Sequence, residues 1–165
     1  VASVVQQPDT STAVEQSTAA TAKADPLAPV FDAYFQLKDA LVASDATKVQ
    51  AKAAAFTDAI KAVDMTQLPN DVHMVWMEVM EPLASTGASI ANTKDIDTQR
   101  KAFVELTAPM SRLVKVASLS APVYLDHCPM YEGRSDWLSR DKAIKNPFYG
   151  AQMMTCGSVK ETIGK

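Results

Sequence analysis

Four runs of apolar residues at helical spacing constrain the fold of this 165-residue chain more than any other feature. These runs cover residues 30–42, 49–63, 72–83 and 96–117, and the run at 49–63 is the clearest. In that run the apolar side chains follow a 4-3-4-3 rhythm, which a helix places on one face; they are Val49, Ala53, Phe56, Ile60 and Val63. The sequence therefore predicts four amphipathic helices.

Residues that favour helix ends separate these runs. Ser44-Asp45 follows the first run, and Asp45 can cap the second helix. The third helix is expected to begin near Asn70, and either Thr93 or Asp95 is expected to cap the fourth. The connections between the helices are therefore short.

Four helices with short connections predict an all-α fold, an antiparallel up-and-down four-helix bundle. Residues 1–24 are rich in Ser, Thr, Ala and Gln, and we interpret them as a low-complexity tether. Residues 25–165 form the predicted helical bundle domain, with the four helices in 25–118. The remaining segment, 119–165, is rich in Pro, Gly and aromatic residues, so we expect an irregular C-terminal cover with short helical turns.

The distribution of charge and hydrophobicity excludes two classes of partner. The net charge is −3, and the Lys and Arg residues form no basic stripe, so no nucleic-acid partner is expected. No apolar run approaches the roughly 20 residues that a transmembrane helix needs. We therefore expect no transmembrane segment.

Sulfur-containing residues are concentrated in two short stretches of the C-terminal segment, "DHCPM" and "MMTCG". Thiolates and thioethers are soft ligands that suit Cu(I). Cys128 and Met130 are two residues apart, and an extended chain points both to one side. Met153 and Cys156 are three apart, and one helical turn places them on one face. These four residues are the candidate ligands of a copper(I) site, and His127 is a further candidate.

A disulfide explains the same two cysteines without any metal. A bond between Cys128 and Cys156 requires only oxidising conditions and Cα atoms within about 7 Å. The closed loop would run from residue 128 to residue 156, 29 residues inclusive. A loop of that length is worth roughly 3–4 kcal/mol. In that case the methionines would be ordinary core residues, and the sequence leaves both interpretations open.

The third predicted helix carries a second group of candidate ligands for a soft metal on one face. His73, Met77 and Met80 are spaced i, i+4 and i+7, which places them on one side of a helix. They are candidates for a second metal site. Equally, Met77 and Met80 could widen the buried face of the helix, since residues at this spacing usually belong to the core.

No arrangement of residues indicates catalysis. His127 and Cys128 are adjacent, but neighbours in sequence seldom have the geometry of a nucleophile and its base, and no third orienting group is evident. There is no serine nucleophile elbow, phosphate-binding loop or haem-attachment motif. We therefore predict a protein that is not an enzyme.

The C-terminal segment resembles a family of periplasmic helical domains of unknown function. The resemblance rests on a series of motifs in fixed order: Tyr124, Cys128-Pro129-Met130, Trp137-Leu138-Ser139, Asn146-Pro147-Phe148, Gly150, Met153 and Cys156-Gly157. The preceding part is similar only in being helical and in the stretch "WMEVMEPL".

Members of the family that these motifs resemble occur alone and fused to adaptor proteins of copper/silver-type heavy-metal efflux systems. The resemblance implies a periplasmic location, often with a lipid anchor, and a metal-efflux adaptor or pump component as the partner. It also implies a role in handling a soft metal, with copper(I) as the cofactor. The alternative is a non-catalytic structural or interaction bundle whose tail is held by a Cys128–Cys156 disulfide.

Overall fold

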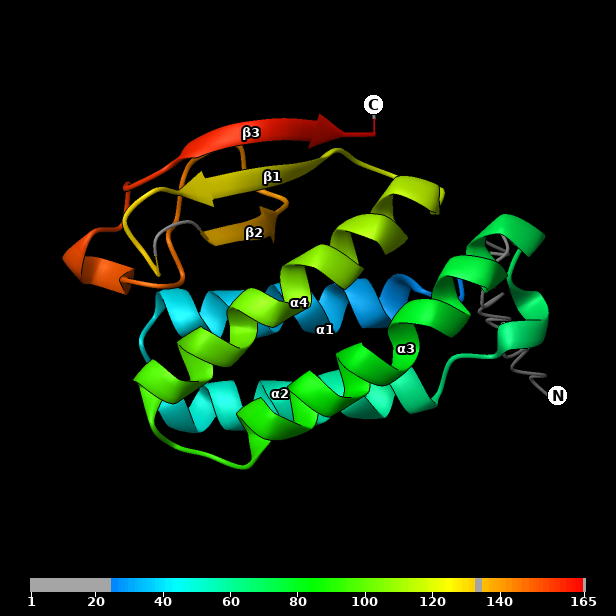
Figure 1. The fold of residues 1–165 in the computed structure, drawn as a ribbon, viewed down its shortest axis with the longest axis horizontal. Helices are drawn as coiled ribbons and strands as arrows, with labels where there is room; N and C mark the ends of the chain where they lie inside the picture. Colours follow the sequence, from blue (N-terminus) through cyan, green and yellow to red (C-terminus); the bar gives the residue numbers. More distant parts are fainter. Residues whose placement is uncertain (1–24, 133–134, 165) are drawn as a thin grey trace, which may run out of the picture.

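The structure is a computed structural model that describes residues 25–132 and 135–164. The predicted tether, residues 1–24, lies outside the described residues. The elements follow one another as α1 (Ala28–Val42), α2 (Ala46–Lys61), the 3-10 turn η1 (Met65–Gln67), α3 (Asn70–Ala91), α4 (Ile96–Val116), β1 (Val123–Cys128), β2 (Ser135–Ser139), the 3-10 turn η2 (Gly150–Gln152) and β3 (Ser158–Ile163) (Figure 1).

The four predicted helices are confirmed, and each packs on the next along the chain. Asp45 caps α2 by accepting a hydrogen bond from the backbone N–H of Lys48, and Asp95 caps α4 through the N–H of Thr98. α3 begins at Asn70, as expected. None of the described helices is long and apolar enough to cross a bilayer.

The helical core is built from the residues of the predicted seams. Val49, Ala53, Phe56 and Ile60 of α2 are all buried, as are Trp76, Val79 and Leu83 of α3 and Phe103, Leu106 and Met110 of α4. Each large apolar side chain buried in this way contributes about 1.5–3 kcal/mol. This burial explains why the helical part of the fold could be predicted from spacing.

The predicted all-α class is wrong, because the C-terminal segment forms a sheet. β1, β2 and β3 make a three-stranded antiparallel sheet in the order β2-β1-β3, so the fold is a mixed α/β structure. Each strand has only five or six residues. β1 and β2 also bury polar Asp126, Ser135 and Ser139. Short strands with buried polar residues lack the apolar–polar alternation by which a strand is recognised.

The sheet is attached to the helices through its edge strand β2. The phenol oxygen of Tyr34 on α1 accepts a hydrogen bond from the N–H of Leu138 (3.1 Å), and Thr107 Oγ1 on α4 donates to the carbonyl of Asp136 (2.6 Å). β3 is the strand farthest from the helices (Figure 1). Its residues are exposed except Ile163. The sheet is therefore fixed to the helices at β2, and β3 forms its exposed edge.

Arg100 of α4 fixes the loop that connects β2 to β3. Its Nε donates to the carbonyl of Pro147 (2.9 Å), and its Nη2 donates to Ser44 Oγ (2.8 Å) and to the carbonyl of Leu41 (3.2 Å). One buried guanidinium thus joins α4, the end of α1 and the C-terminal segment. Because all of these acceptors are uncharged, it acts as a multiple hydrogen-bond donor and forms no ion pair with them.

Candidate functional site

The structure brings the two cysteines together. Their Sγ atoms are 4.0 Å apart, and both are free thiols. Cys128 is the last residue of β1 and is fully buried, whereas Cys156 lies two residues before β3 and is partly exposed. β1 and β3 are paired, with His127 opposite Ser158. Strand pairing therefore holds two residues that are 28 positions apart in sequence side by side.

Asn146 builds the turn that carries Cys156. Its side chain is completely buried; Nδ2 donates to the carbonyl of Cys156 (2.8 Å) and Oδ1 accepts from the N–H groups of Phe148 (2.8 Å) and Tyr149 (3.2 Å). Its own N–H donates to the carbonyl of Met154 (2.8 Å). A side chain that satisfies three backbone groups at once fixes the position of the cysteine without touching its sulfur.

Asn146→Ala is expected to lower the free energy of unfolding by about 2 kcal/mol, because it leaves the buried N–H of Phe148 and the partly buried carbonyl of Cys156 without partners. Urea unfolding in a reducing buffer measures this loss. Asn92→Ala, at the exposed C-cap of α3, is the matched control. An Asn146 variant as stable as the Asn92 variant would show that the turn is held by other contacts.

Gly157 allows the chain to pass close to β1 directly after Cys156. Its φ is +136°, and a Cβ at this position would lie 2.7 Å from the carbonyl oxygen of His127 and 3.0 Å from the ring of Trp137. Any other residue would be strained at this angle and would collide with backbone. The Cys156-Gly157 motif is therefore explained by the approach of the two strands.

A series of aromatic rings connects the segments that precede and follow the two cysteines. Phe148 packs edge-on against buried Trp137, with ring centroids 5.8 Å apart, and stacks on Tyr131 at 4.7 Å. Tyr149 contacts Tyr131 edge-on, and its hydroxyl donates to the carbonyl of Met130 (3.2 Å). Burial raises the pKa of Tyr149, and the charges of Cys128 and Cys156 raise it further.

The thiols affect one another electrostatically. Loss of contact with water raises the pKa of the Cys156 thiol, and the hydrogen bond and charge of Cys128 raise it further. A metal ion that binds both sulfurs must displace these protons. Metal affinity at such a pair therefore increases with pH.

The predicted thioether ligands, Met130 and Met153, lie at the surface. The side chain of Met130 is 63% exposed in the turn after β1, and that of Met153, just after η2, is 37% exposed. Met153 is linked to the site through its carbonyl, which accepts from the N–H of Cys156 (3.1 Å). Long, flexible methionine side chains at this position can reach an ion only by turning inward.

His127 lies on the other side of the strand from Cys128, since successive residues of a strand point to opposite faces. Its Nδ1 is 2.6 Å from Asp136 Oδ1 on β2, and Lys160 Nζ on β3 is 3.0 Å from Asp136 Oδ2. Desolvation raises the pKa of Asp136, but hydrogen bonds from His127 and Lys160 outweigh it and hold that pKa below its usual value. His127 is therefore separated from the thiol pair and belongs to a different polar cluster.

The second predicted group of candidate ligands lies on α3, away from the sheet (Figure 1). His73 is partly buried in the first turn, Met77 is 51% exposed and Met80 is partly buried against Trp76 in a crevice between α2 and α3. Within the described ranges, no three His, Cys, Asp or Glu side chains are grouped closely enough to hold a metal ion.

Sequence reasoning missed three residues near these sites. Asp126 is completely buried on the same face of β1 as Cys128, and Asp136 and Lys160 form the cluster with His127. Asp126 follows buried Leu125 directly, and both are buried because the strand register shifts between them, which regular alternation would not predict. The partnership of Asp136 and Lys160 depends on strand register, which the sequence does not display.

Comparison with known protein families identifies a family for the helical part of the chain. A family described as "Protein of unknown function (DUF3347)" matches residues 30–121, more than half of the chain. The matched region begins within the first turn of α1, covers the other three helices and ends just before β1, so the cysteines lie beyond it. No curated protein and no solved structure matches the chain.

Proposed function

The chain belongs to the DUF3347 family of proteins of unknown function, and we propose that it is a non-catalytic module that binds one soft metal ion, Cu(I), between Cys128 and Cys156. The observation that carries this proposal is the 4.0 Å separation of the two Sγ atoms. The helical bundle serves as the scaffold, and the small sheet forms the site.

The sulfur separation suits a bridging ion. A metal bonded to two thiolates at about 2.3 Å, the length of a zinc–thiolate bond, holds the sulfurs about 3.8 Å apart in tetrahedral geometry and about 4.6 Å apart in linear geometry. The observed separation falls within this range. A disulfide instead requires the sulfurs to approach to about 2.05 Å.

The ligand types favour Cu(I) over harder ions. Two thiolates with two thioethers at the rim, from Met130 and Met153, make a soft donor set that contains no carboxylate or imidazole. Calcium and magnesium prefer oxygen ligands. Structural zinc sites usually have four Cys or His ligands, and the described residues bring no third such group to the pair.

The resemblance of the C-terminal motifs to periplasmic domains that accompany copper/silver efflux adaptors supports the biological setting. We propose that the protein acts in the periplasm, with a lipid anchor, and passes its ion to an adaptor or pump component of an efflux system. A partly exposed ligand, Cys156, suits transfer, because an incoming ligand can reach the ion from one side.

A second candidate is a structural or interaction module in which the same cysteines form a disulfide between the end of β1 and the segment before β3. The adjacency of the two thiols favours this candidate as well. Such a bond would close a 29-residue loop (128 to 156 inclusive) and stabilise the small sheet by roughly 3–4 kcal/mol. An oxidising compartment favours the oxidised pair.

A thiol count followed by a copper titration separates the two candidates. Reaction with a thiol reagent under denaturing conditions counts free thiols in the protein as isolated. The reduced protein is then titrated with Cu(I) against a chromophoric chelator. The metal-binding proposal predicts uptake of one ion per chain with an affinity that rises with pH. Blocked thiols together with no uptake after reduction would contradict it and support the disulfide.

A further inference from the structure

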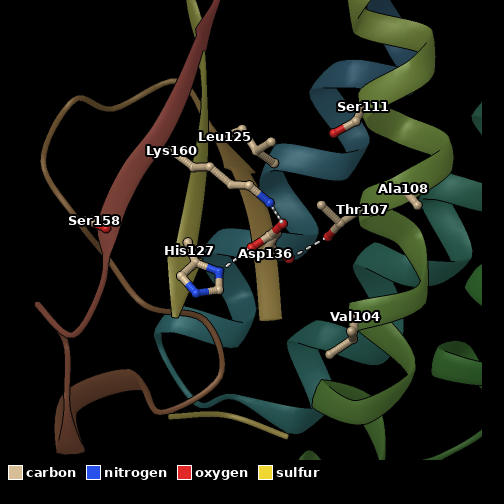
Figure 2. Close-up of a pocket in the computed structure, with 9 residues that line it drawn as sticks. All are labelled: Val104, Thr107, Ala108, Ser111, Leu125, His127, Asp136, Ser158 and Lys160. Carbon is tan, nitrogen blue, oxygen red and sulfur yellow. Dashed lines mark hydrogen bonds and ion pairs between the residues drawn. The ribbon is translucent and has the colours of Figure 1, made fainter. Parts of the chain in front are cut away.

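A second site is formed on the opposite face of β1 from the thiol pair. A cavity of about 470 Å³ lies between α4 and this face of the sheet. Figure 2 shows Val104, Ala108 and Ser111 on the helical side, and His127, Asp136 and Lys160 reaching in from three different strands. This volume falls within the roughly 300–1,000 Å³ typical of small-molecule sites.

The cavity exists because small residues occupy the facing positions. Ala108 and Ser111 lie one helical turn apart on α4, and Ser158 faces them from β3. Packed interfaces between a helix and a sheet are normally filled by larger side chains. Val104 and Leu125 supply an apolar wall beside these small residues. A ligand with a compact apolar body fits this part of the cavity.

The polar part of the cavity is set up to donate hydrogen bonds. Both oxygens of Asp136 already have partners, since Oδ1 accepts from His127 Nδ1 (2.6 Å) and Oδ2 accepts from Lys160 Nζ (3.0 Å). The Lys160 ammonium has two further N–H donors, and the hydroxyls of Ser111 and Ser158 can donate as well. A cationic ligand would share the Asp136 carboxylate with His127 and Lys160 and would lie close to the Lys160 ammonium, whereas an anionic ligand can accept from that ammonium directly.

We propose that this cavity binds a small organic carboxylate, with its carboxylate on Lys160 and its apolar body between Val104, Ala108 and Leu125. His127 is held in place by Asp136, and its Nε2 is the ring nitrogen left for the ligand. The site is independent of the thiol pair, because the two lie on opposite faces of β1.

Three planar probes of nearly equal shape test the charge preference: benzoate, benzamide and benzamidine. Each is titrated into the full ¹⁵N-labelled chain, and amide shifts of residues around the cavity are followed by NMR. The proposal predicts that benzoate shifts the amides of Ser158 and Lys160 and binds at least about tenfold more tightly than the other two, as expected for a charge-assisted contact. Equal binding of all three, preferred binding of benzamidine, or no binding of benzoate would overturn it.

Two variants locate the binding. Lys160→Met keeps the alkyl stem, removes the ammonium and is expected to weaken benzoate binding about tenfold. Ala108→Leu fills the cavity from an exposed position of α4 and is expected to abolish it. Lys142→Met, at an exposed lysine outside the cavity, is the matched control. If the control variant loses as much affinity as Lys160→Met, the effect is general charge and the proposed site is wrong. Unchanged circular dichroism confirms that each variant is folded.

Discussion

Asp126→Asn is expected to make the protein more stable at pH 8, by up to about 4 kcal/mol, and to change little at pH 4. Asp126 is completely buried, and neither carboxylate oxygen has a hydrogen-bond partner among the described residues. Burial raises the pKa of this carboxyl to about 7, although the charge of Lys38 lowers it. Asn keeps the shape and cannot ionise.

The direction of this effect follows from the two pKa values. In the folded protein the pKa of Asp126 is about 7, while in the unfolded chain it is near the ordinary 3.9. Between these values the folded state keeps a proton that the unfolded state releases. The free energy of unfolding therefore falls as the pH rises from about 4 to about 7, and the full penalty is present above pH 7.

Urea unfolding of the wild type and the variant in a reducing buffer, at pH 5 and pH 8, measures the effect. The difference between the proteins should grow with pH. Asp58→Asn, at an exposed position of α2, should show no such growth. A constant difference between Asp126→Asn and the wild type across this range would mean that the carboxylate has a partner in solution.

Cys156→Ser is expected to lower the affinity for Cu(I) by at least about 100-fold, because a hydroxyl is a poor ligand for a soft ion and only one thiolate would remain. Because Cys156 is partly exposed, the free energy of unfolding in a reducing buffer is expected to change by less than about 1 kcal/mol. Competition with a chromophoric Cu(I) chelator measures the affinity.

Substitution of Met130 tests how much its thioether contributes to the affinity for Cu(I). Met130→Leu is expected to weaken Cu(I) binding by about tenfold or less, because the Met130 side chain is largely exposed. Met74→Leu, at an exposed methionine on α3, is the control and should leave the affinity unchanged. If Cys156→Ser binds Cu(I) as tightly as the wild type, the thiol pair does not bind the ion.

The helices could be predicted because each has several turns with one apolar stripe and a capping residue at its start. Val49, Ala53, Phe56 and Ile60 are buried as their spacing indicates. The sheet could not be predicted in this way. β3 has one buried residue, and β1 buries Asp126 next to Leu125, so neither shows regular alternation.

The proximity of Cys128 and Cys156 was predicted. The position of His127 was not, because the segment that contains it was predicted to be irregular and is a strand. An irregular segment placed no restriction on His127, whereas a strand turns it away from Cys128 and towards Asp136. The motif residues Asn146 and Gly157 hold the turn and the close strand approach. Their roles depend on backbone contacts that only the folded chain reveals.

X-ray absorption at the copper edge tests the central claim most directly. The reduced protein is loaded with one equivalent of Cu(I), and its spectrum is compared with that of Cys156→Ser loaded in the same way. The account predicts a first shell made of sulfur alone in the wild type, with fewer sulfur neighbours in the variant. A first shell of nitrogen or oxygen ligands, or identical spectra for the two proteins, would contradict it.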